Sequence, residues 1–219
     1  MKRFLARQLS NPTGFAGRLV GGIMKMANRA PTRMAVEALA IQPGESVLDL
    51  GCGPGQAAAL MLPLALPGRV VGIDQSQTMI LQAGRDNRRA MAAGQMDFHL
   101  ATFDALPFDA AIFDAVLASN VMYFWHDPVP VLAEIRRVMK DEGRLSIYLT
   151  SADSMQNWGF AEAGTHRLFS AEDVEAALRD GGFADGDICV RVVPIGKGVS
   201  GILATARKRS SQAGILRAA

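Results

Sequence analysis

The chain has 219 residues, of which 49% are hydrophobic and 20% are charged, and its formal net charge is +2. These values exclude a disordered polar chain, and so small a net charge gives no reason to expect nucleic-acid binding. No apolar run reaches the ~18 uncharged residues that a membrane-spanning helix needs, so we expect none.

Residues 1–42 are predicted to form a helical cap or lid outside the core domain. Apolar residues recur there at helical spacing, beside basic residues: Phe15, Leu19, Ile23 and Met26, with Arg18, Lys25 and Arg29. Three interpretations stay open for this stripe: a lid over the substrate, a helix packed on the domain, and a segment that touches a membrane surface. A second helix is predicted from Thr32 to Ala40, after Pro31, whose missing N–H costs nothing at a helix start.

A glycine-rich turn follows the first predicted strand, in the segment V-L-D-L-G-C-G-P-G over residues 47–55. A short apolar strand, three glycines and then a run of helix formers from Gln56 are the design of a nucleotide site. Without Cβ atoms the backbone can lie against a ligand, and the following helix points N–H groups at it. The third glycine comes one residue earlier than in the dinucleotide pattern G-x-G-x-x-G, which argues against a nicotinamide oxidoreductase.

With the preceding acid this segment reads D-x-G-x-G-x-G, which resembles the first motif of the class I S-adenosylmethionine (SAM)-dependent methyltransferases. The resemblance implies SAM as cofactor and S-adenosylhomocysteine (SAH) as product. It implies cofactor contacts by Asp49, Gly51, Cys52, Gly53 and Gly55. The alternative is an ordinary glycine-rich turn after a strand.

The second predicted strand, residues 69–74, ends in Asp74, which lies 19 residues past Gly55. Carboxyl ends of adjacent strands in a doubly wound sheet face one crevice. Asp74 is therefore placed to accept hydrogen bonds from both hydroxyls of a ribose. The alternative is a cap for a helix predicted from Ser76 to Arg89, which Ser76 could supply instead.

Two further segments resemble motifs of the same family. Residues 74–79, D-Q-S-Q-T-M, resemble its D-x-S-x-x-M segment, which implies that Gln75 and Met79 contact the cofactor, Met79 near the adenine. Residues 102–108, T-F-D-A-L-P-F, follow a strand predicted over 96–101 and resemble G-D-A-x-x-L-P-F. That resemblance implies that Asp104 accepts from the exocyclic amine of adenine and that the Ala105 N–H donates to a ring nitrogen; the alternative is an acid in a surface turn.

The fourth predicted strand, residues 113–119, runs into N-V-M-Y-F-W-H-D-P. Polar and aromatic side chains at a central strand end indicate a substrate site. By resemblance, the backbone near Ser119 and Asn120 holds the methionine part of SAM. Four residues are candidates to line the acceptor pocket: Met122, Tyr123, Trp125 and His126. His126 or Tyr123 could act as a catalytic base, since an imidazole titrates near neutrality, while a structural role for His126 stays open.

The last third continues the pattern. A helix is predicted over 128–139, a turn over 141–143 and a strand over 144–149. Across these elements, residues 132–145 resemble the family's L-x-E-x-x-R-V-L-K-P-G-G-x-L. Residues 151–168 are predicted to cover the site. A helix over 170–181 carries a capping box from Ser170 to Asp173, and strands over 188–195 and 199–206 form a hairpin. The tail from Arg207 is basic and predicted to fray.

The resemblance extends over about residues 44–150 and is closest to the small-molecule branch that includes ubiquinone and menaquinone methyltransferases. It implies an α/β fold: a Rossmann-like three-layer sandwich whose seven-stranded, mostly parallel sheet has one antiparallel strand. The expected organisation is a helical lid at 1–42, a methyltransferase domain at 43–208 and a basic tail at 209–219.

The predicted function is methyl transfer from SAM to a small-molecule acceptor by in-line displacement. Alternatives are a lipid or quinone methyltransferase at the membrane surface, with peripheral contact through the amino-terminal helix, and a SAM-binding protein without turnover. Cys52 and Cys189 form no metal or redox spacing, so we expect no metal, a reducing compartment and a cytoplasmic protein. Arg7 and Arg18 interrupt the apolar start, which argues for mature protein rather than a signal peptide.

Overall fold

The computed structural model describes residues 29–155, 167–196 and 198–210. Its elements, in chain order, are α3 (Arg29–Ala38), β1 (Ser46–Leu50), α4 (Gln56–Ala65), β2 (Arg69–Asp74), α5 (Gln77–Asp86), α6 (Arg88–Ala92), β3 (Met96–Leu100), β4 (Phe113–Ser119), the 3-10 helix η1 (Met122–Phe124), α7 (Pro128–Val138), β5 (Met139–Thr150), α8 (Ala152–Met155), α9 (Ala171–Asp180), the 3-10 helix η3 (Asp185–Asp187), β6 (Ile188–Gly196) and β7 (Val199–Arg207). Strands and helices alternate, which is the order that gives a mostly parallel sheet.

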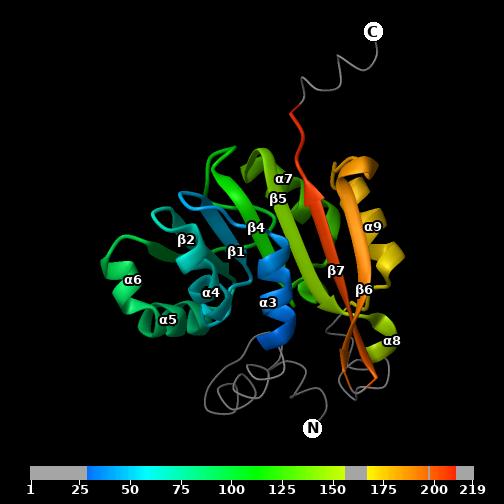
Figure 1. Cartoon of the computed structure of the whole chain (residues 1–219), viewed down its shortest axis with the longest axis horizontal. Coiled ribbons are helices and arrows are strands. Elements are labelled where there is room, and N and C mark those ends of the chain that lie inside the picture. Colours follow the sequence, from blue (N-terminus) through cyan, green and yellow to red (C-terminus); the bar gives the residue numbers. More distant parts are fainter. Residues whose placement is uncertain (1–28, 156–166, 197, 211–219) are drawn as a thin grey trace.

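In the described residues, seven strands form one sheet in the order β3-β2-β1-β4-β5-β7-β6 (Figure 1). β1 pairs in parallel with β2 and with β4, whereas β7 runs antiparallel to both of its neighbours, β5 and β6. This confirms the predicted sheet and the closing hairpin. The chain runs outward from β1 to β3 and then returns to place β4 on the other side of β1. The carboxyl ends of β1 and β4 therefore flank the topological switch point, where doubly wound sheets bind ligands.

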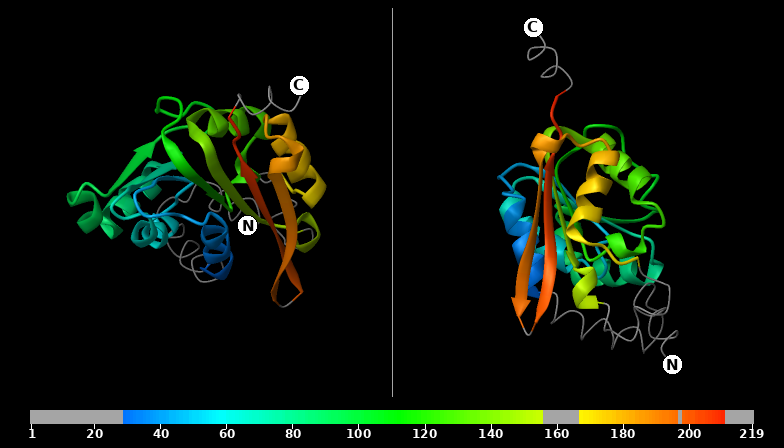
Figure 2. Two further views of the ribbon diagram at one scale, coloured as in Figure 1. Left: turned by 45° about the horizontal axis from the view of Figure 1, so that its top comes forward. Right: turned by 90° about the vertical axis from the view of Figure 1, so that its right-hand side faces the viewer.

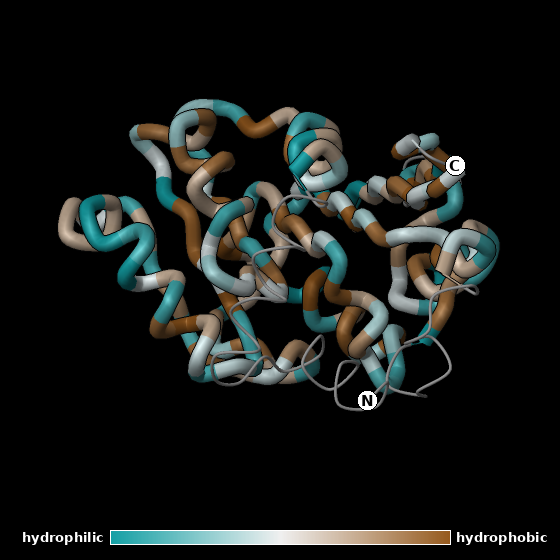
Figure 3. The backbone as a smooth tube through the Cα atoms, turned by 90° about the horizontal axis from the view of Figure 1, so that it is seen from below, coloured by the Kyte–Doolittle hydropathy of each residue, from teal (hydrophilic) through white to brown (hydrophobic). Residues whose placement is uncertain are grey.

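Helices cover both faces of the sheet and give three layers (Figure 2). α3, α4 and α5 contact one face, while α7 and α9 contact the other. Each face has its own cluster of buried apolar side chains, one including Leu39 and Met61 and the other Leu132 and Leu178. Hydrophilic and hydrophobic residues alternate along the helices, as expected when one side of each helix is buried (Figure 3).

Two helix starts follow signals in the sequence. α9 has the predicted capping box: Ser170 Oγ accepts from the Asp173 N–H at 3.1 Å, and the Asp173 carboxylate accepts from the Ser170 N–H at 2.8 Å. α7 is capped by Asp127, whose carboxylate accepts from the Val129 N–H at 3.0 Å, with proline in the first turn. α7 thus begins at a defined point, immediately after the segment that carries His126.

Three predicted elements have other limits. The helix predicted over 76–89 is interrupted at Asn87, whose backbone leaves the helical region and whose side chain donates to the Ala83 carbonyl at 2.9 Å. The strand predicted from residue 144 begins at Met139, and the predicted turn at 141–143 is a bulge within it, where Glu142 has φ of 62°. The helix predicted over 32–40 is α3, which ends before Ala40, whose φ is 48°.

Some predictions concern segments that the structure does not describe. The stripe within residues 1–28, the tail beyond residue 210 and residues 156–166 of the predicted cover lie outside the described residues. The prediction that the tail frays from Arg207 is wrong for its first residues: Arg207 ends β7, the Lys208 N–H donates to the Gly143 carbonyl at 3.0 Å, and Arg209 pairs with Asp187 at 2.7 Å. Within the described part, no helix is both long and apolar enough to cross a bilayer.

Candidate active site

β1 ends in a glycine turn whose backbone suits no other residue at two positions. φ is 74° at Gly51 and 77° at Gly55. A Cβ on Gly51 would lie 2.3 Å from Cγ2 of Val121, and a Cβ on Gly55 would lie 2.8 Å from the ring of Phe98. Both positions therefore need glycine for the backbone angle and for space. α4 begins directly after the turn at Gln56, so its unpaired N–H groups lie at the same edge of the sheet.

The carboxylate of Asp74, the last residue of β2, joins this turn to the start of α5. Its Oδ2 accepts from the Gly53 N–H at 2.9 Å, and its Oδ1 accepts from the Ser76 N–H at 2.8 Å. Burial raises the pKa of Asp74, and these N–H donors oppose the rise. Asp74 is not the N-cap of α5, since Ser76 holds that position without a capping side-chain bond. Each carboxylate oxygen keeps a further lone pair for a donor such as a hydroxyl.

Asp49, near the end of β1, has different surroundings. Its side chain is 2% exposed, and Oδ2 has no hydrogen-bond partner among the described residues. Burial raises the pKa of Asp49 to about 7, the Ala58 N–H of α4 opposes the rise, and the charge of Asp74 adds to it. A buried carboxylate oxygen without a partner favours a ligand that brings a cation or a hydrogen-bond donor.

The thiol of Cys52 lies close enough to both acids for their charges to act on it. Burial, followed by the charges of Asp49 and Asp74, raises the pKa of the Cys52 thiol well above its usual value. The thiol therefore stays protonated, and Cys52 has none of the thiolate character of a reactive cysteine.

The loop that carries the predicted base-reading residues begins next to the end of β2. The Ala101 N–H donates to the carbonyl of Asp74 at 3.2 Å, so the two strand ends lie side by side. Asp104 and Ala105 are exposed. The side chains on either side of them are buried: Phe103 and Leu106. Asp74 and Asp104 therefore follow neighbouring strands at one edge of the sheet.

The end of β4 is held from two sides. Asn120 has φ of 56°, a conformation that asparagine tolerates, and its N–H donates to the Tyr148 carbonyl of β5 at 2.7 Å. Ser119 Oγ lies 3.5 Å from Thr32 Oγ1 of α3. α3 thus reaches the switch point, a contact that sequence reasoning missed because Thr32 belongs to no motif.

The two candidate bases lie in different settings. Tyr123 is buried: its phenol oxygen accepts from the Thr150 N–H, and its O–H donates to Asn120 Oδ1 at 3.4 Å. Burial raises the pKa of Tyr123, which disfavours the phenolate that a base would need. His126 is exposed, just before the first turn of α7. The geometry therefore favours a positioning role for Tyr123 and leaves His126 accessible.

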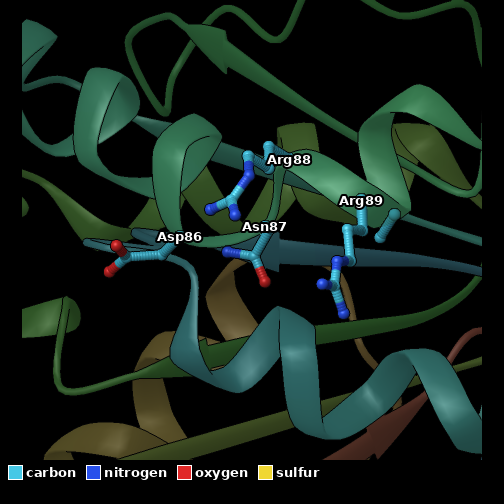
Figure 4. A pocket seen from close by; sticks show the side chains of 5 residues that line it. Asp86, Asn87, Arg88 and Arg89 are labelled. Atoms are coloured by element: carbon cyan, nitrogen blue, oxygen red, sulfur yellow. The ribbon is translucent and has the colours of Figure 1, made fainter.

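A cavity of about 340 Å³ lies at the junction of α5 and α6 (Figure 4). It is lined by Asp86, Asn87, Arg88, Arg89 and Ala90. Its link to the turn is Asn87, whose Nδ2 donates to the Gly55 carbonyl at 3.4 Å. None of the predicted site residues lines this cavity. In the ranges that the structure describes, no group of three or more His, Cys, Asp or Glu could hold a metal ion.

Comparisons with known proteins agree with this geometry. A model of the family described as "Methyltransferase domain" matches residues 48–147. The chain is 35% identical over 116 residues to the 2-phytyl-1,4-naphtoquinone methyltransferase of Synechococcus elongatus, covering 52% of this chain and 50% of that protein. It is 31% identical over 170 residues to the O-methyltransferase rstn1 of Aspergillus nomiae, covering 73% of each.

A solved structure with the same fold is that of the [4+2]-cyclase SpnF. It aligns with a TM-score of 0.69 at 22% identity, covering 83% of this chain and 82% of that chain. The chain spans about half the length of several curated relatives that it matches.

Proposed function

This chain belongs to the class I SAM-dependent methyltransferase family, and we propose that it transfers a methyl group from SAM to a small-molecule acceptor by in-line displacement. The observation that carries the proposal is the cluster at the ends of β1 and β2. There the carboxylate of Asp74 accepts from the Gly53 N–H, and one buried oxygen of Asp49 has no partner among the described residues. Such a cradle suits a ligand with hydroxyl and ammonium donors, as SAM has.

The residues present fit SAM, and the proposed contacts follow the strand ends. The turn after β1 and its acid cradle the methionine and the ribose of SAM, and the acid at the end of β2 accepts from the ribose hydroxyls. The loop after β3 reads the edge of the adenine. The end of β4 holds the methionine part. In that order the contacts are Asp49, Gly51, Cys52, Gly53 and Gly55; Asp74, Gln75 and Met79; Asp104 and Ala105; Ser119 and Asn120.

In this proposal the protein contributes orientation more than acid–base chemistry. When bound, SAM supplies a methyl group activated by the positive charge of its sulfur. The chain's part is to hold the acceptor in line with that methyl and to keep water out, and orientation of this kind can supply roughly 7–11 kcal/mol. Asp49 would anchor the ammonium group and Asp74 the ribose.

A proton leaves the acceptor in such a reaction when the acceptor is a hydroxyl or an amine. We assign the accessible His126, or the acceptor itself, to take that proton. Tyr123 is assigned a positioning role instead. Its phenol joins η1 to the end of β5 through Asn120 and Thr150, and so shapes the wall beside the reacting groups.

The domain organisation is part of the proposal: a helical cap at residues 1–42, a methyltransferase domain at 43–208 and a basic tail at 209–219. Support for the cap comes from α3, which touches Ser119 through Thr32. The cap and residues 151–168 would then select the acceptor. We propose a cytoplasmic setting, without a nucleic-acid partner.

A second candidate function is quinone or lipid methylation at a membrane surface. The 35% identity to a naphthoquinone methyltransferase favours it. A third is SAM binding without methyl transfer, because a protein of this fold is a cyclase. The three differ in acceptor and in turnover, and they share the same cofactor site.

Two measurements test the proposal. Calorimetric titration of the full chain with SAH should give saturable binding, and no heat with no thermal shift at millimolar SAH would defeat it. Incubation with methyl-labelled SAM and a panel of phenols and demethylated naphthoquinones, with and without anionic liposomes, should label one acceptor class. Binding without label in any arm would favour the protein without turnover.

A further inference from the structure

Two residues of α7 hold the backbone of the loop after β3. Glu134 Oε1 accepts from the Leu106 N–H at 2.8 Å. Arg137 Nη2 donates to the Phe108 carbonyl at 2.8 Å and to the Leu106 carbonyl at 3.3 Å. One pair of side chains therefore makes three hydrogen bonds to residues 106–108, directly after the residues proposed to read adenine.

The pair is also bound to itself in a fixed geometry. Arg137 Nε donates to Glu134 Oε2 at 2.7 Å, and Arg137 Nη2 donates to Oε1 at 2.7 Å. The Glu134 side chain is only 15% exposed. Bonds from Arg137 first, and the Leu106 N–H after them, hold the pKa of Glu134 below its usual value, while the charge of Asp104 acts against them. Asp104 is thus close enough to Glu134 for its charge to matter, and Arg137 offsets the repulsion.

The bond to the Leu106 N–H acts on the base-reading backbone itself. That N–H belongs to the planar peptide unit that joins Leu106 to Ala105. Fixing the orientation of this unit restricts the backbone of Ala105, whose own N–H is proposed to donate to adenine. The aromatic packing of Phe108, whose ring centroid lies 5.0 Å from that of Phe113, fixes the far end of the loop and leaves this peptide unit untouched.

We propose that Glu134 and Arg137 are positioning residues for base selectivity: through the backbone of residues 106–108 they hold Ala105 and Asp104 where these read a 6-aminopurine. The inference rests on the proposed SAM site. A 6-oxopurine presents a carbonyl where adenine donates and an N–H where adenine accepts. The correctly held loop therefore rejects it, and a loop released from α7 adapts to either base.

The test compares two ligands that differ only in the base, SAH and S-inosylhomocysteine, by calorimetry on the full chain. The wild type should prefer SAH by at least about tenfold. Glu134→Ala and Arg137→Ala should reduce that preference to within about threefold, with Glu134→Gln in between, because Gln keeps an oxygen for the Leu106 N–H. Glu175→Ala is the matched control, since Glu175 pairs with Arg179 on α9 at 3.1 Å, away from the loop.

The outcomes separate selectivity from stability and from the proposed function. Equal losses for both ligands, with the preference kept, would mean that the pair only stabilises the fold and would overturn the inference. A wild type that binds SAH without base preference would overturn it too, while leaving SAM binding intact. A wild type that binds neither ligand would defeat the proposed function itself. Circular dichroism shows whether each variant folds. If the alanine variants do not fold, the base preference of Glu134→Gln decides between these outcomes.

Discussion

Two aspartates of the proposed site differ in how many of their carboxylate oxygens have a hydrogen-bond partner. Asp74 accepts from two N–H groups, whereas Oδ2 of Asp49 has no partner among the described residues. The same side chain therefore serves as a fixed acceptor in one place and as a titratable anchor in the other. Each role leads to its own prediction.

Asp74→Ala should weaken SAH binding at least about tenfold, or about 1.4 kcal/mol, because two ribose hydroxyls lose their acceptor. Calorimetry with SAH and with its 2′,3′-dideoxy analogue measures the effect. The wild type should bind the analogue more weakly, and the variant should bind both alike. Asp97→Ala is the control, since that acid is exposed and pairs with His99 at 3.0 Å. A deoxyribose penalty that persists in Asp74→Ala would contradict the ribose assignment.

Asp49→Asn should change how stability depends on pH. The carboxyl of the unfolded chain has an ordinary pKa of 3.8, whereas burial raises the pKa of Asp49 in the folded chain to about 7, so the folded carboxyl holds its proton to about pH 7. Its contribution to stability is therefore full below about pH 4 and is lost as the pH rises to about 7. Asparagine does not ionise, so the unfolding free energy of the variant relative to wild type should rise by on the order of 3–4 kcal/mol across this window.

Urea unfolding at several pH values measures the difference between Asp49→Asn and the wild type. Groups common to both proteins cancel in that difference. A difference that stays constant between pH 4 and pH 8 would show that Asp49 is ionised in the folded protein at acidic pH, against the expectation from its burial.

At the scale of elements, the site depends on contacts between the ends of strands and the segments that follow them. η1 is joined to the end of β5 through Tyr123, and α7 is joined to the loop after β3 through Glu134 and Arg137. The glycine turn packs on Val121 so closely that a Cβ at Gly51 would overlap it. These links cross from one strand end to the next.

Tyr123→Phe should lower the unfolding free energy by about 1–3 kcal/mol, because the partly buried Thr150 N–H loses its acceptor. If Tyr123 is a positioning residue, the Tyr123→Phe variant should transfer methyl groups more slowly, and its pH–rate profile should keep the shape of the wild-type profile. A rate that loses its pH dependence in Tyr123→Phe, and keeps it in His126→Gln, would instead identify Tyr123 as the base.

At the scale of the whole molecule, segments far apart in the chain close the structure around the sheet. Arg144 of β5 donates from Nε to the Leu39 carbonyl at 2.7 Å, across 105 residues, and its guanidinium pairs with Glu45. The contact ties the connection between α3 and β1 to the middle of the sheet. It also keeps α3 where Thr32 reaches the end of β4.

Arg144→Ala should lower the unfolding free energy by about 1–3 kcal/mol, because the Leu39 carbonyl loses its donor and the partly buried carboxylate of Glu45 loses its cation and keeps the Gln42 N–H. Arg207→Ala, which removes an exposed pair with Glu142 at 3.5 Å, should change stability by less than about 0.5 kcal/mol. Chemical unfolding of both variants measures the contrast. Equal effects would mean that the link between α3 and the sheet adds nothing beyond a surface ion pair.

Sequence alone was sufficient for what depends on local pattern. The glycine spacing after an apolar strand, the acid at residue 74 and the capping box at residues 170–173 each depend on neighbours within a few residues. The resemblance over about residues 44–150 then predicted the seven-stranded sheet, and the glycines and acids at strand ends predicted the edge at which the site would lie. The SAM contacts themselves stay predictions, because no ligand contact has been tested.

Only the tertiary structure decided which groups meet across the sheet. It showed that Gly53 donates to Asp74, that Thr32 reaches Ser119, and that Glu134 and Arg137 hold the loop at 106–108. It also showed that Tyr123 is buried and that this burial raises the pKa of its phenol. The reason is physical: hydrogen-bond partners, burial and pKa depend on side chains that the fold brings together from 20 to 100 or so residues away, and no local spacing records them.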